Sequence, residues 1–391
     1  MAGPIPTIFL IAAEPSGDAL GGRLMAALSR QLDGQVAFDG IGGERMAAAG
    51  LVSRVPLSAL SLFGVFEVLP QAMRILRLVR DTADAIVAAK PAAVVTIDSS
   101  GFNFRLARRL RQAGYAGPLV HYVAPQLWAW WRPAKARALV AWYDRVLALF
   151  PFEPAFFAGH GIDCRFVGHP AIEEGFGDRA DPTFRERHGI PPGVPVLAVL
   201  PGSRGSEIKR LLPIFADATA ELARRIPGLH VVLPTVPTVA DRVAQAVAGW
   251  GVPVTVIRDR RDKPAAFAES TAALAASGTV TLELALSGTP FVVGYQLNAL
   301  TAWLLRRKAT VRYATMVNLL MDRAIVPELL QEACTAAALA DALESLLTDP
   351  AARERQRRDL AVAIGRLGLD GAPPSERAAA EVLSLMAART G

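Results

Sequence analysis

Two short segments of small and charged residues follow apolar runs and could together bind a phosphate group. They are LPGSRGSE at residues 200–207 and ASGTVTLE at residues 276–283, and a helical pattern begins in each. The first N–H groups of a helix have no partner within the helix and carry the positive end of its dipole, and small residues let an anion approach them. The residues expected to form this nucleotide-binding site are Gly202, Ser203, Arg204, Ser277, Gly278 and Thr279.

Glu283 could extend this site toward a sugar. It follows Thr279 by four residues, about one helical turn, so its carboxylate could accept hydrogen bonds from a ribose diol at a fixed distance from the phosphates. Serine and threonine are also ordinary helix caps. The pattern therefore leaves a second interpretation open, in which both helices are merely capped and Glu283 is a solvated surface acid.

Asp98 is a candidate general base. It stands in VVTIDSSGFNF directly after an apolar run, at the carboxyl end of an expected strand. A partly desolvated carboxylate at this place could remove a proton from a sugar hydroxyl. The alternative is that Asp98 caps the helix that begins near Phe102.

A glycine-rich loop, EPSGDALGG, covers residues 14–22. It lacks the G-x-G-x-x-G spacing of a dinucleotide-binding loop, so it is weak evidence for a dehydrogenase. Its N–H groups could nevertheless hold a phosphate of some ligand. The residues expected to do so are Ser16, Gly17 and Asp18.

Residues 57–80 place apolar side chains beside arginines at helical spacing. This combination suits a surface that dips into an anionic membrane or holds an acylated ligand. A buried helical hairpin with a solvated arginine face would produce the same pattern. The residues of the expected surface, called the apolar–basic patch below, are Leu62, Phe63, Val65, Phe66, Val68, Leu69, Arg74 and Arg77.

Several other chemistries are disfavoured. The two cysteines and five histidines show no metal-ligand spacing, and the G-x-S-x-G motif of a serine nucleophile is absent. Trp128, Trp130 and Trp131 could stack on bases, but no long basic run or nucleic-acid module accompanies them, so packing in a core or cleft wall is the better interpretation. The net charge of +6 favours anionic partners. We expect no metal, no cofactor and no nucleic acid.

The elements that must position these residues alternate between strands and helices. Because 391 residues exceed one ordinary core, we expect two domains, each a parallel sheet covered on both faces by helices. This is an α/β fold of two Rossmann-like domains facing a central cleft, joined by a linker at Gly168–Pro195. The expected strands are Thr7–Ala13, Val36–Ile41, Ala93–Ile97, Leu119–Val123, Arg145–Leu149, Val196–Leu200, His230–Leu233, Val254–Ile257, Ala272–Ala275 and Pro290–Tyr295.

Apolar runs in the chain are interpreted as strands and not as membrane segments. The first run, Thr7–Ala13, follows no basic segment and is followed at once by Glu14 and Asp18, which favours a strand over a signal peptide. Two longer uncharged stretches, Gln112–Trp131 and Leu284–Leu305, are interrupted by glycine and proline or by polar residues.

Ten motifs, in order and across nearly the whole chain, resemble those of the lipid-A-disaccharide synthase family. This family has the GT-B fold, and the resemblance implies an inverting hexosyltransferase that works without a bound metal. The motifs are EPSGD (14–18), IDSSGFNF (97–104), HYVAPQLWAW (121–130), LALFPFE (147–153), GHP (168–170), LPGSRGSE (200–207), ASGTVTLE (276–283), VVGY (292–295), NLL (318–320) and PELLQE (327–332).

The resemblance implies a donor, an acceptor and roles for several residues. The donor is UDP-2,3-diacylglucosamine, and the acceptor is 2,3-diacylglucosamine 1-phosphate (lipid X), which are joined by a β(1→6) bond with release of UDP. By matching motifs, Asp98 is the base on the acceptor 6-hydroxyl, Glu14 lies with it at the catalytic edge, and Arg204 stabilises the leaving diphosphate. The UDP ligands would be Ser277, Gly278, Thr279, Glu283 and Asn318.

The resemblance also implies a location and a domain plan. Members are cytoplasmic and peripheral on the inner membrane, and their C-terminal helices can be exchanged within a homodimer. Residues 1–168 would form the acceptor-binding domain with the membrane-facing surface, residues 169–350 the UDP-sugar-binding domain, and residues 351–391 helices that pack back on the first domain.

This chain departs from the family pattern in the Asp98 loop. Family members often carry a second acid there, but Ser100 and Gly101 leave Asp98 as the only carboxylate. Two other functions stay open from the residues: a UDP-sugar epimerase of the same architecture, and a non-catalytic binder of acylated phospholipids.

Overall fold

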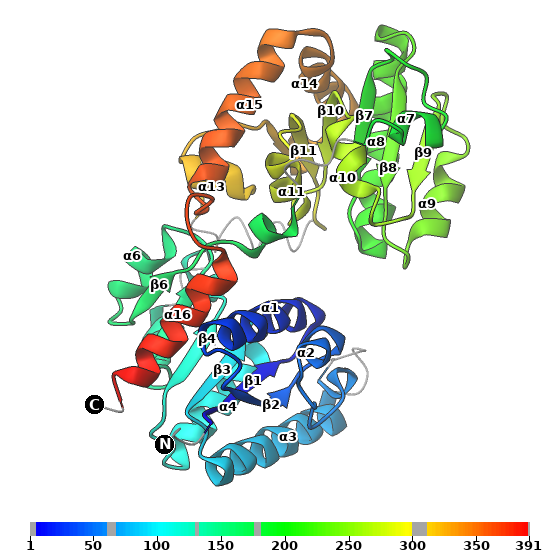
Figure 1. Ribbon diagram of the computed structural model, residues 1–391. Coiled ribbons are helices and arrows are strands. Elements are labelled where there is room, and N and C mark those ends of the chain that lie inside the picture. The colour runs from blue at the N-terminus through cyan, green and yellow to red at the C-terminus, as the bar shows by residue number, and fades with distance from the viewer. Residues whose placement is uncertain (1–4, 61–67, 130–132, 176–180, 299–310, 390–391) are drawn as a thin grey trace. The chain divides into compact units, whose positions relative to one another are not determined.

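The chain folds into two compact units (Figure 1). The computed structural model describes residues 5–60, 68–129, 133–175, 181–298 and 311–389. One unit joins Met1–Pro170 to Leu367–Gly391, and the other comprises Ala171–Arg366. Each contains a six-stranded sheet in which every strand pair is parallel. The predicted α/β fold with two Rossmann-like domains is therefore confirmed.

The sheet of the first unit has the strand order β2-β1-β3-β4-β5-β6. Its central strands are buried on both faces, which is why they appear in the sequence as continuous apolar runs. The strands are β1 (Thr7–Ala12), β2 (Ala37–Ile41), β3 (Ala93–Ile97), β4 (Leu119–Tyr122), β5 (Arg145–Ala148) and β6 (Cys164–Phe166). The helices are α1 (Pro15–Gln31), α2 (Glu44–Ala48), η1 (Leu57–Ala59), α3 (Val68–Ala89), α4 (Ser100–Gln112), η2 (Leu127–Ala129), α5 (Pro133–Val140), α6 (Glu153–Ala158) and α16 (Pro374–Ala387).

The sheet of the second unit has the order β12-β11-β10-β7-β8-β9, which is the strand order of a Rossmann fold. Its strands are β7 (Val196–Leu200), β8 (His230–Pro234), β9 (Val254–Ile257), β10 (Ala272–Ala275), β11 (Phe291–Tyr295) and β12 (Glu328–Leu330). Its helices are η3 (Pro170–Glu174), which begins at the last residue of the first unit, α7 (Phe184–Arg187), α8 (Gly205–Arg225), α9 (Ala240–Val247), α10 (Lys263–Ala268), α11 (Val280–Leu286), α13 (Met316–Met321), η4 (Gln331–Ala333), α14 (Ala336–Thr348) and α15 (Pro350–Gly365).

Two short strands were not predicted from the sequence. β6 and β12 are three residues long and lie at sheet edges, where half-buried side chains leave no continuous apolar run. The second half of the segment predicted as a linker contains a helix, α7, that belongs to the second unit. The Phe184 side chain is fully buried, and Arg185 pairs with Glu269 at 2.7 Å, so α7 packs on the second unit.

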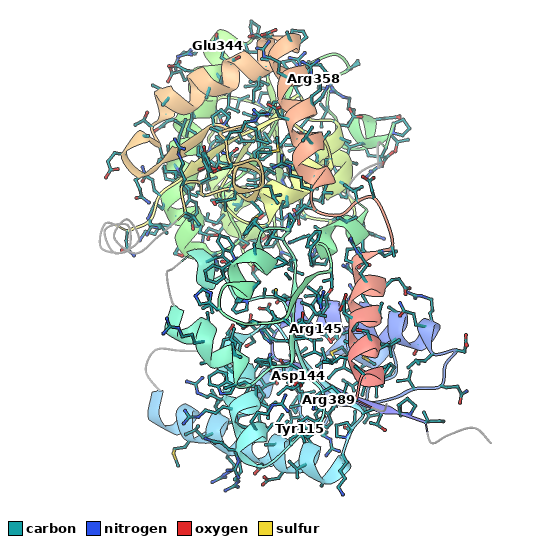
Figure 2. All side chains as sticks on the ribbon, turned by 90° about the vertical axis from the view of Figure 1, so that its left-hand side faces the viewer. Tyr115, Asp144, Arg145, Glu344, Arg358 and Arg389 are labelled. Atoms are coloured by element: carbon teal, nitrogen blue, oxygen red, sulfur yellow. The ribbon has the colours of Figure 1, made fainter. Side chains whose placement is uncertain are left out.

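The C-terminal residues divide between the units, which differs from the prediction for 351–391. α15 stays with the second unit because Gln356 bonds both the N–H and the C=O of Phe291, and because Arg323 pairs with Asp359. Of the two C-terminal helices, only α16 belongs to the first unit, where it lies beside α1 (Figure 1). It is held there by Arg145, which bonds Glu381 at 2.8 Å, and the chain end is held by an ion pair between Arg389 and Asp144 (Figure 2).

Each sheet has a topological switch point, where consecutive strands leave in opposite directions along the sheet. In the first sheet it falls between β1 and β3, and in the second between β7 and β10. Loops at the carboxyl ends of such strand pairs diverge and leave a crevice that binds ligands in α/β proteins. The segments that follow β1, β3, β7 and β10 are the ones that carry Glu14, Asp98, Arg204 and Ser277.

No helix in the described part of the chain combines the length and the apolar character needed to cross a bilayer. Of the apolar–basic patch, Leu62, Phe63, Val65 and Phe66 lie outside the described residues, and Val68 and Leu69 belong to the first turn of α3. Arg74 and Arg77 are exposed on α3. Two apolar side chains beside them, Met73 and Leu76, are 67% and 52% exposed.

Candidate functional site

Asp98 lies at the switch point of the first sheet, together with Ser16. The Ser16 hydroxyl donates a hydrogen bond of 2.9 Å to Asp98 Oδ2, so the loops after β1 and β3 meet there. Ser16 is exposed in the first turn of α1, and Asp98 is partly exposed. The residue that precedes α4 is Ser99, and no side chain caps this helix. Asp98 is therefore not the helix cap that the sequence left as an alternative, and its carboxylate is available to a ligand.

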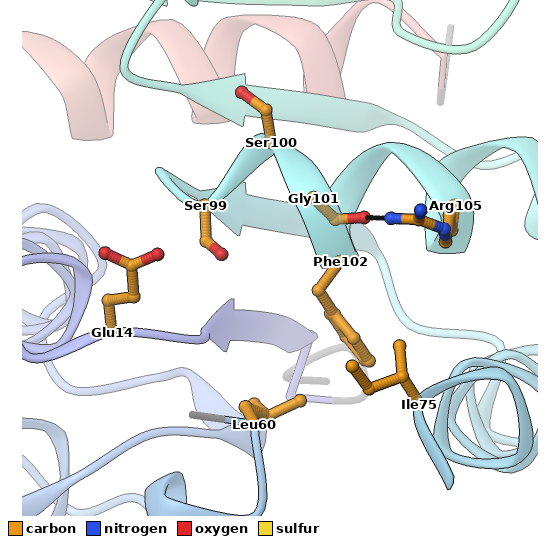
Figure 3. A pocket seen from close by; sticks show the side chains of 8 residues that line it. All are labelled: Glu14, Leu60, Ile75, Ser99, Ser100, Gly101, Phe102 and Arg105. Carbon is orange, nitrogen blue, oxygen red and sulfur yellow. Dashed lines mark hydrogen bonds between the residues drawn. The ribbon is translucent and has the colours of Figure 1, made fainter. Parts of the chain in front are cut away.

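A pocket of about 380 Å³ is lined by Ser99, the residue that follows Asp98, and by the first turn of α4 (Figure 3). One part of its wall is polar, formed by Glu14, Ser99 and Ser100, and another part is apolar, formed by Leu60, Ile75 and Phe102. Gly101 and Arg105 complete the lining. A Cβ atom on Gly101 would meet nothing within 4 Å, so the absent second acid of the family motif leaves open space there. The pocket can take a molecule with both hydroxyl and hydrocarbon parts.

Asp18 and Gly17 do not form a phosphate loop. Asp18 is 5% exposed, and its carboxylate accepts hydrogen bonds from the N–H groups of Gly43, Arg45 and Met46 at 2.7–3.0 Å. Its charge thus occupies the N-terminus of α2, where an anion would otherwise bind. Gly17 is buried against the Ile97 carbonyl, so its lack of a side chain serves close packing of α1 on the sheet. Of these three residues, only Ser16 is exposed.

In the second unit, Arg204 precedes the first turn of α8. Its side chain is 79% exposed, and its guanidinium donates to Glu207 Oε1 at 3.1 Å. The other oxygen of Glu207 accepts the N–H groups of Ser203 and Arg204, each at 3.2 Å. Gly202 has φ +108°, and a Cβ there would stand 2.5 Å from Glu207 Oε2. Glycine is thus required where the chain turns, and Glu207 holds Arg204 at the helix N-terminus.

The segment after β10 adjoins this turn, because β10 and β7 are paired. Ser277 donates to the Ala314 carbonyl at 3.1 Å, whereas Gly278 and Thr279 are exposed. Glu283 is not a freely solvated acid: its side chain is 17% exposed and forms an ion pair with Lys263. The structure therefore gathers Gly202, Ser203, Arg204 and the 277–279 turn at the switch point of the second sheet, with Glu283 on the helix behind them.

Asn318 has no atom left for a ligand. It is fully buried, and its amide donates to the Val326 carbonyl at 2.9 Å and to Glu328 Oε1 at 2.7 Å. Its carbonyl oxygen accepts the N–H groups of Ile325 and Val326. Glu328 in turn accepts from the N–H groups of Ala314 and Thr315, both at 2.8 Å. Asn318, which the sequence predicts as a nucleotide ligand, thus uses both polar atoms of its side chain within the protein, where it shapes the loop that receives Ser277.

Glu153 is a buried acid that sequence reasoning did not single out. It is 1% exposed at the start of α6, where it accepts hydrogen bonds from the indole N–H of Trp128 and from the N–H groups of Leu149 and Phe150, all at 3.0 Å. Burial raises its pKa to about 7, although these three donors favour the charged form. Glu153 is the last residue of the motif LALFPFE, but nothing in the sequence around a single glutamate in a turn indicates that its side chain is buried.

The pH dependence of stability should reveal this acid. Between pH about 4.5 and 7 the folded protein holds a proton on Glu153 that the unfolded chain has released, so rising pH favours unfolding. We expect the stability of the wild type relative to Glu153→Gln to fall by up to about 3 kcal/mol across this window. Urea denaturation of both proteins at several pH values measures the difference, and a difference independent of pH would contradict the assignment.

Comparison with known proteins identifies the family. The family model described as lipid-A-disaccharide synthetase matches residues 8–367. The lipid-A-disaccharide synthase of Rhodospirillum centenum is 50% identical over 98% of this chain and 95% of its own length. That of Paramagnetospirillum magneticum is 48% identical over 97% of each.

Solved structures share the fold at low sequence identity. A putative UDP-N-acetylglucosamine 2-epimerase from Listeria monocytogenes has a TM-score of 0.63 at 13% identity, covering 99% of this chain and 97% of its own. The calicheamicin glycosyltransferase CalG4 has a TM-score of 0.60 at 18% identity and covers 98% of both chains. These likenesses show the architecture alone, whereas the family model and the relatives match across nearly the whole sequence. The chain therefore belongs to the lipid-A-disaccharide synthase family.

Proposed function

We propose that the chain is an inverting hexosyltransferase that forms the disaccharide of lipid A. It transfers 2,3-diacylglucosamine from its UDP donor to the 6-hydroxyl of lipid X, forms a β(1→6) bond and releases UDP. The observation that carries this proposal is the family membership, together with two relatives named lipid-A-disaccharide synthase that are 50% and 48% identical over 98% and 97% of this chain. The likeness to epimerases is one of fold and does not favour an epimerase.

The first unit supplies the acceptor side of this reaction. Asp98 takes the proton from the acceptor hydroxyl as its oxygen bonds to the anomeric carbon, and Ser16 orients the carboxylate through its 2.9 Å hydrogen bond. The adjoining pocket offers polar groups for the sugar, including Glu14, and apolar groups such as Leu60 and Phe102 for acyl carbons. A diacylated sugar has this mixture of surfaces.

The second unit supplies the donor side. The N–H groups at the start of α8 and the guanidinium of Arg204 meet the negative charge that grows on the diphosphate as the glycosidic bond breaks. The exposed Gly278 and Thr279 let the phosphates approach the turn after β10. Glu283 accepts the ribose hydroxyls, with Lys263 holding its carboxylate in place.

One assay separates this function from its alternatives. The purified chain is incubated with UDP-2,3-diacylglucosamine and lipid X without added metal, and UDP and the disaccharide are measured. Formation of both in equal amounts supports the synthase. An altered UDP-sugar without any need for lipid X would point to an epimerase, and binding of the lipids without product would point to a carrier.

The apolar–basic patch suits association with an anionic membrane. Its described part carries the exposed Arg74 and Arg77 next to the exposed Met73 and Leu76, so basic and apolar groups alternate on one surface of α3. Such a surface would keep the enzyme at the inner membrane that holds both of its lipid substrates. The cytoplasmic, peripheral location is part of this proposal.

Replacing Phe63 and Phe66 together with serine should weaken binding to anionic liposomes severalfold while the fold stays intact, because apolar area is lost from the membrane contact. Co-sedimentation with vesicles measures the bound fraction, and circular dichroism checks the fold. Val52→Ser is a matched control, because Val52 is an apolar residue 86% exposed outside the patch. Equal co-sedimentation of the double variant and the wild type would refute a membrane role for these residues.

A further inference from the structure

The backbone that presents Asp98 is held in an unfavourable conformation. Asp98 has φ +52° and Ser99 has φ +38°, so two successive residues with side chains occupy the left-handed region. Each such residue costs conformational energy, and these conformations persist only where the surroundings enforce them. Something in the fold must therefore hold the turn between β3 and α4.

The side chain of Asn103 provides this restraint. It is fully buried in the first turn of α4, and its amide donates to the Asp98 carbonyl at 2.7 Å and to the Ile97 carbonyl at 3.0 Å. These bonds clamp the last residue of β3 and the carboxylate-bearing residue to α4. Asp98 is also tied to the sheet, because its N–H donates to the Tyr122 carbonyl at 2.9 Å.

Among the described residues, the Asn103 side chain makes hydrogen bonds through its amide nitrogen only. Within the described residues, Asn103 Oδ1 is buried and accepts no hydrogen bond. A buried acceptor without a partner lowers stability, so a residue chosen for stability alone would avoid it. The two donated bonds therefore favour a role for this side chain in holding the turn.

A buried cluster of neutral polar side chains, Thr96, His121 and Tyr143, contacts the Asn103 backbone through Tyr143. The Tyr143 hydroxyl donates to the Asn103 carbonyl at 3.1 Å, and Thr96 Oγ1 lies 3.1 Å from that hydroxyl and 2.9 Å from His121 Nδ1. Burial lowers the pKa of His121 to about 3 and raises that of Tyr143. The cluster therefore carries no charge at neutral pH.

We propose that Asn103 is a positioning residue for glycosyl transfer, whose amide clamps the left-handed Asp98–Ser99 turn and so fixes the Asp98 carboxylate against Ser16, next to the Ser99 wall of the acceptor pocket. The inference rests on the proposed function of Asp98 as the base on the acceptor hydroxyl. Asn103 itself touches no reacting atom. It affects the reaction only through the position of the Asp98 carboxylate. Its substitution should therefore change catalysis without changing how the second unit binds the donor.

The test compares Asn103→Ala and Asn103→Asp with Gln356→Ala. The aspartate keeps the shape of Asn103 but loses the amide donors. Gln356 is a matched control because it is also a buried amide that donates to two backbone carbonyls, Phe291 and Ile325, yet it meets β11 at its amino end. Steady-state kinetics with UDP-2,3-diacylglucosamine and lipid X give kcat and KM, and thermal denaturation reports stability.

Both Asn103 variants should lower kcat by about a hundredfold, since a displaced catalytic group costs this much, with an unchanged KM for the UDP donor. Gln356→Ala should lower the melting temperature while kcat stays within about threefold of the wild type, as expected for substitutions away from the reacting groups. A kcat near the wild-type value in either folded Asn103 variant would overturn the inference, as would an equal loss of kcat in Gln356→Ala. If Asn103→Ala does not fold, Asn103→Asp decides. An inactive wild type would instead refute the proposed function.

Discussion

Asp98→Asn is expected to reduce kcat by about a hundredfold or more, because a positioned general base contributes rate factors of this size. The asparagine keeps the shape of the side chain and an oxygen that can accept the 2.9 Å hydrogen bond from Ser16. The backbone clamp from Asn103 acts on the carbonyl of residue 98 and is also unchanged. The substitution therefore removes the capacity to take a proton and little else.

Kinetics of disaccharide formation and UDP release measure this effect, and the melting temperature verifies the fold. Asp39→Asn serves as a control, because Asp39 lies on β2 of the same unit and pairs with Arg54. It should lose some stability and retain turnover. Turnover of Asp98→Asn within a few fold of the wild type would remove Asp98 as the base.

Arg204→Ala is expected to lower kcat by a similar factor for an electrostatic reason. The diphosphate gains negative charge in the transition state, and a preorganised donor aimed at such charge contributes about 3 to 4 kcal/mol. Arg204 is 79% exposed and pairs with Glu207 alone among the described ion pairs, so its removal leaves the fold intact. The Glu207 bonds to the N–H groups of Ser203 and Arg204 remain in the variant.

Arg224→Ala is a matched control for this variant. Arg224 is an exposed arginine on α8, but it lies in the last turn while Arg204 precedes the first. Single-turnover measurements should show a slow chemical step in Arg204→Ala and a normal one in Arg224→Ala. A normal chemical step in both variants would assign the diphosphate charge to other groups.

The sequence alone was enough to predict the architecture and the sheet edge at which the candidate site residues lie. Strands such as β3 and β7 are buried on both faces, so each appears as an unbroken apolar run, and helical spacing follows each run. The carboxyl ends of parallel strands meet at one edge of a sheet. The residues directly after these runs, Asp98 and Arg204 among them, were therefore predictable as site residues.

Partners that are distant in the sequence were decided by the tertiary structure. Asp18 looks like part of a phosphate loop until α2 brings three N–H groups to its carboxylate. The sequence predicts Asn318 as a nucleotide ligand, whereas in the structure its amide donates hydrogen bonds to Val326 and Glu328. The burial and hydrogen bonds of Glu153 and Asn103 likewise arise only in the packed fold. α16 contacts α1 across more than three hundred residues of chain. Local pattern determines which element a residue joins, but the contacts of its side chain depend on how the elements pack, which only the tertiary structure decides.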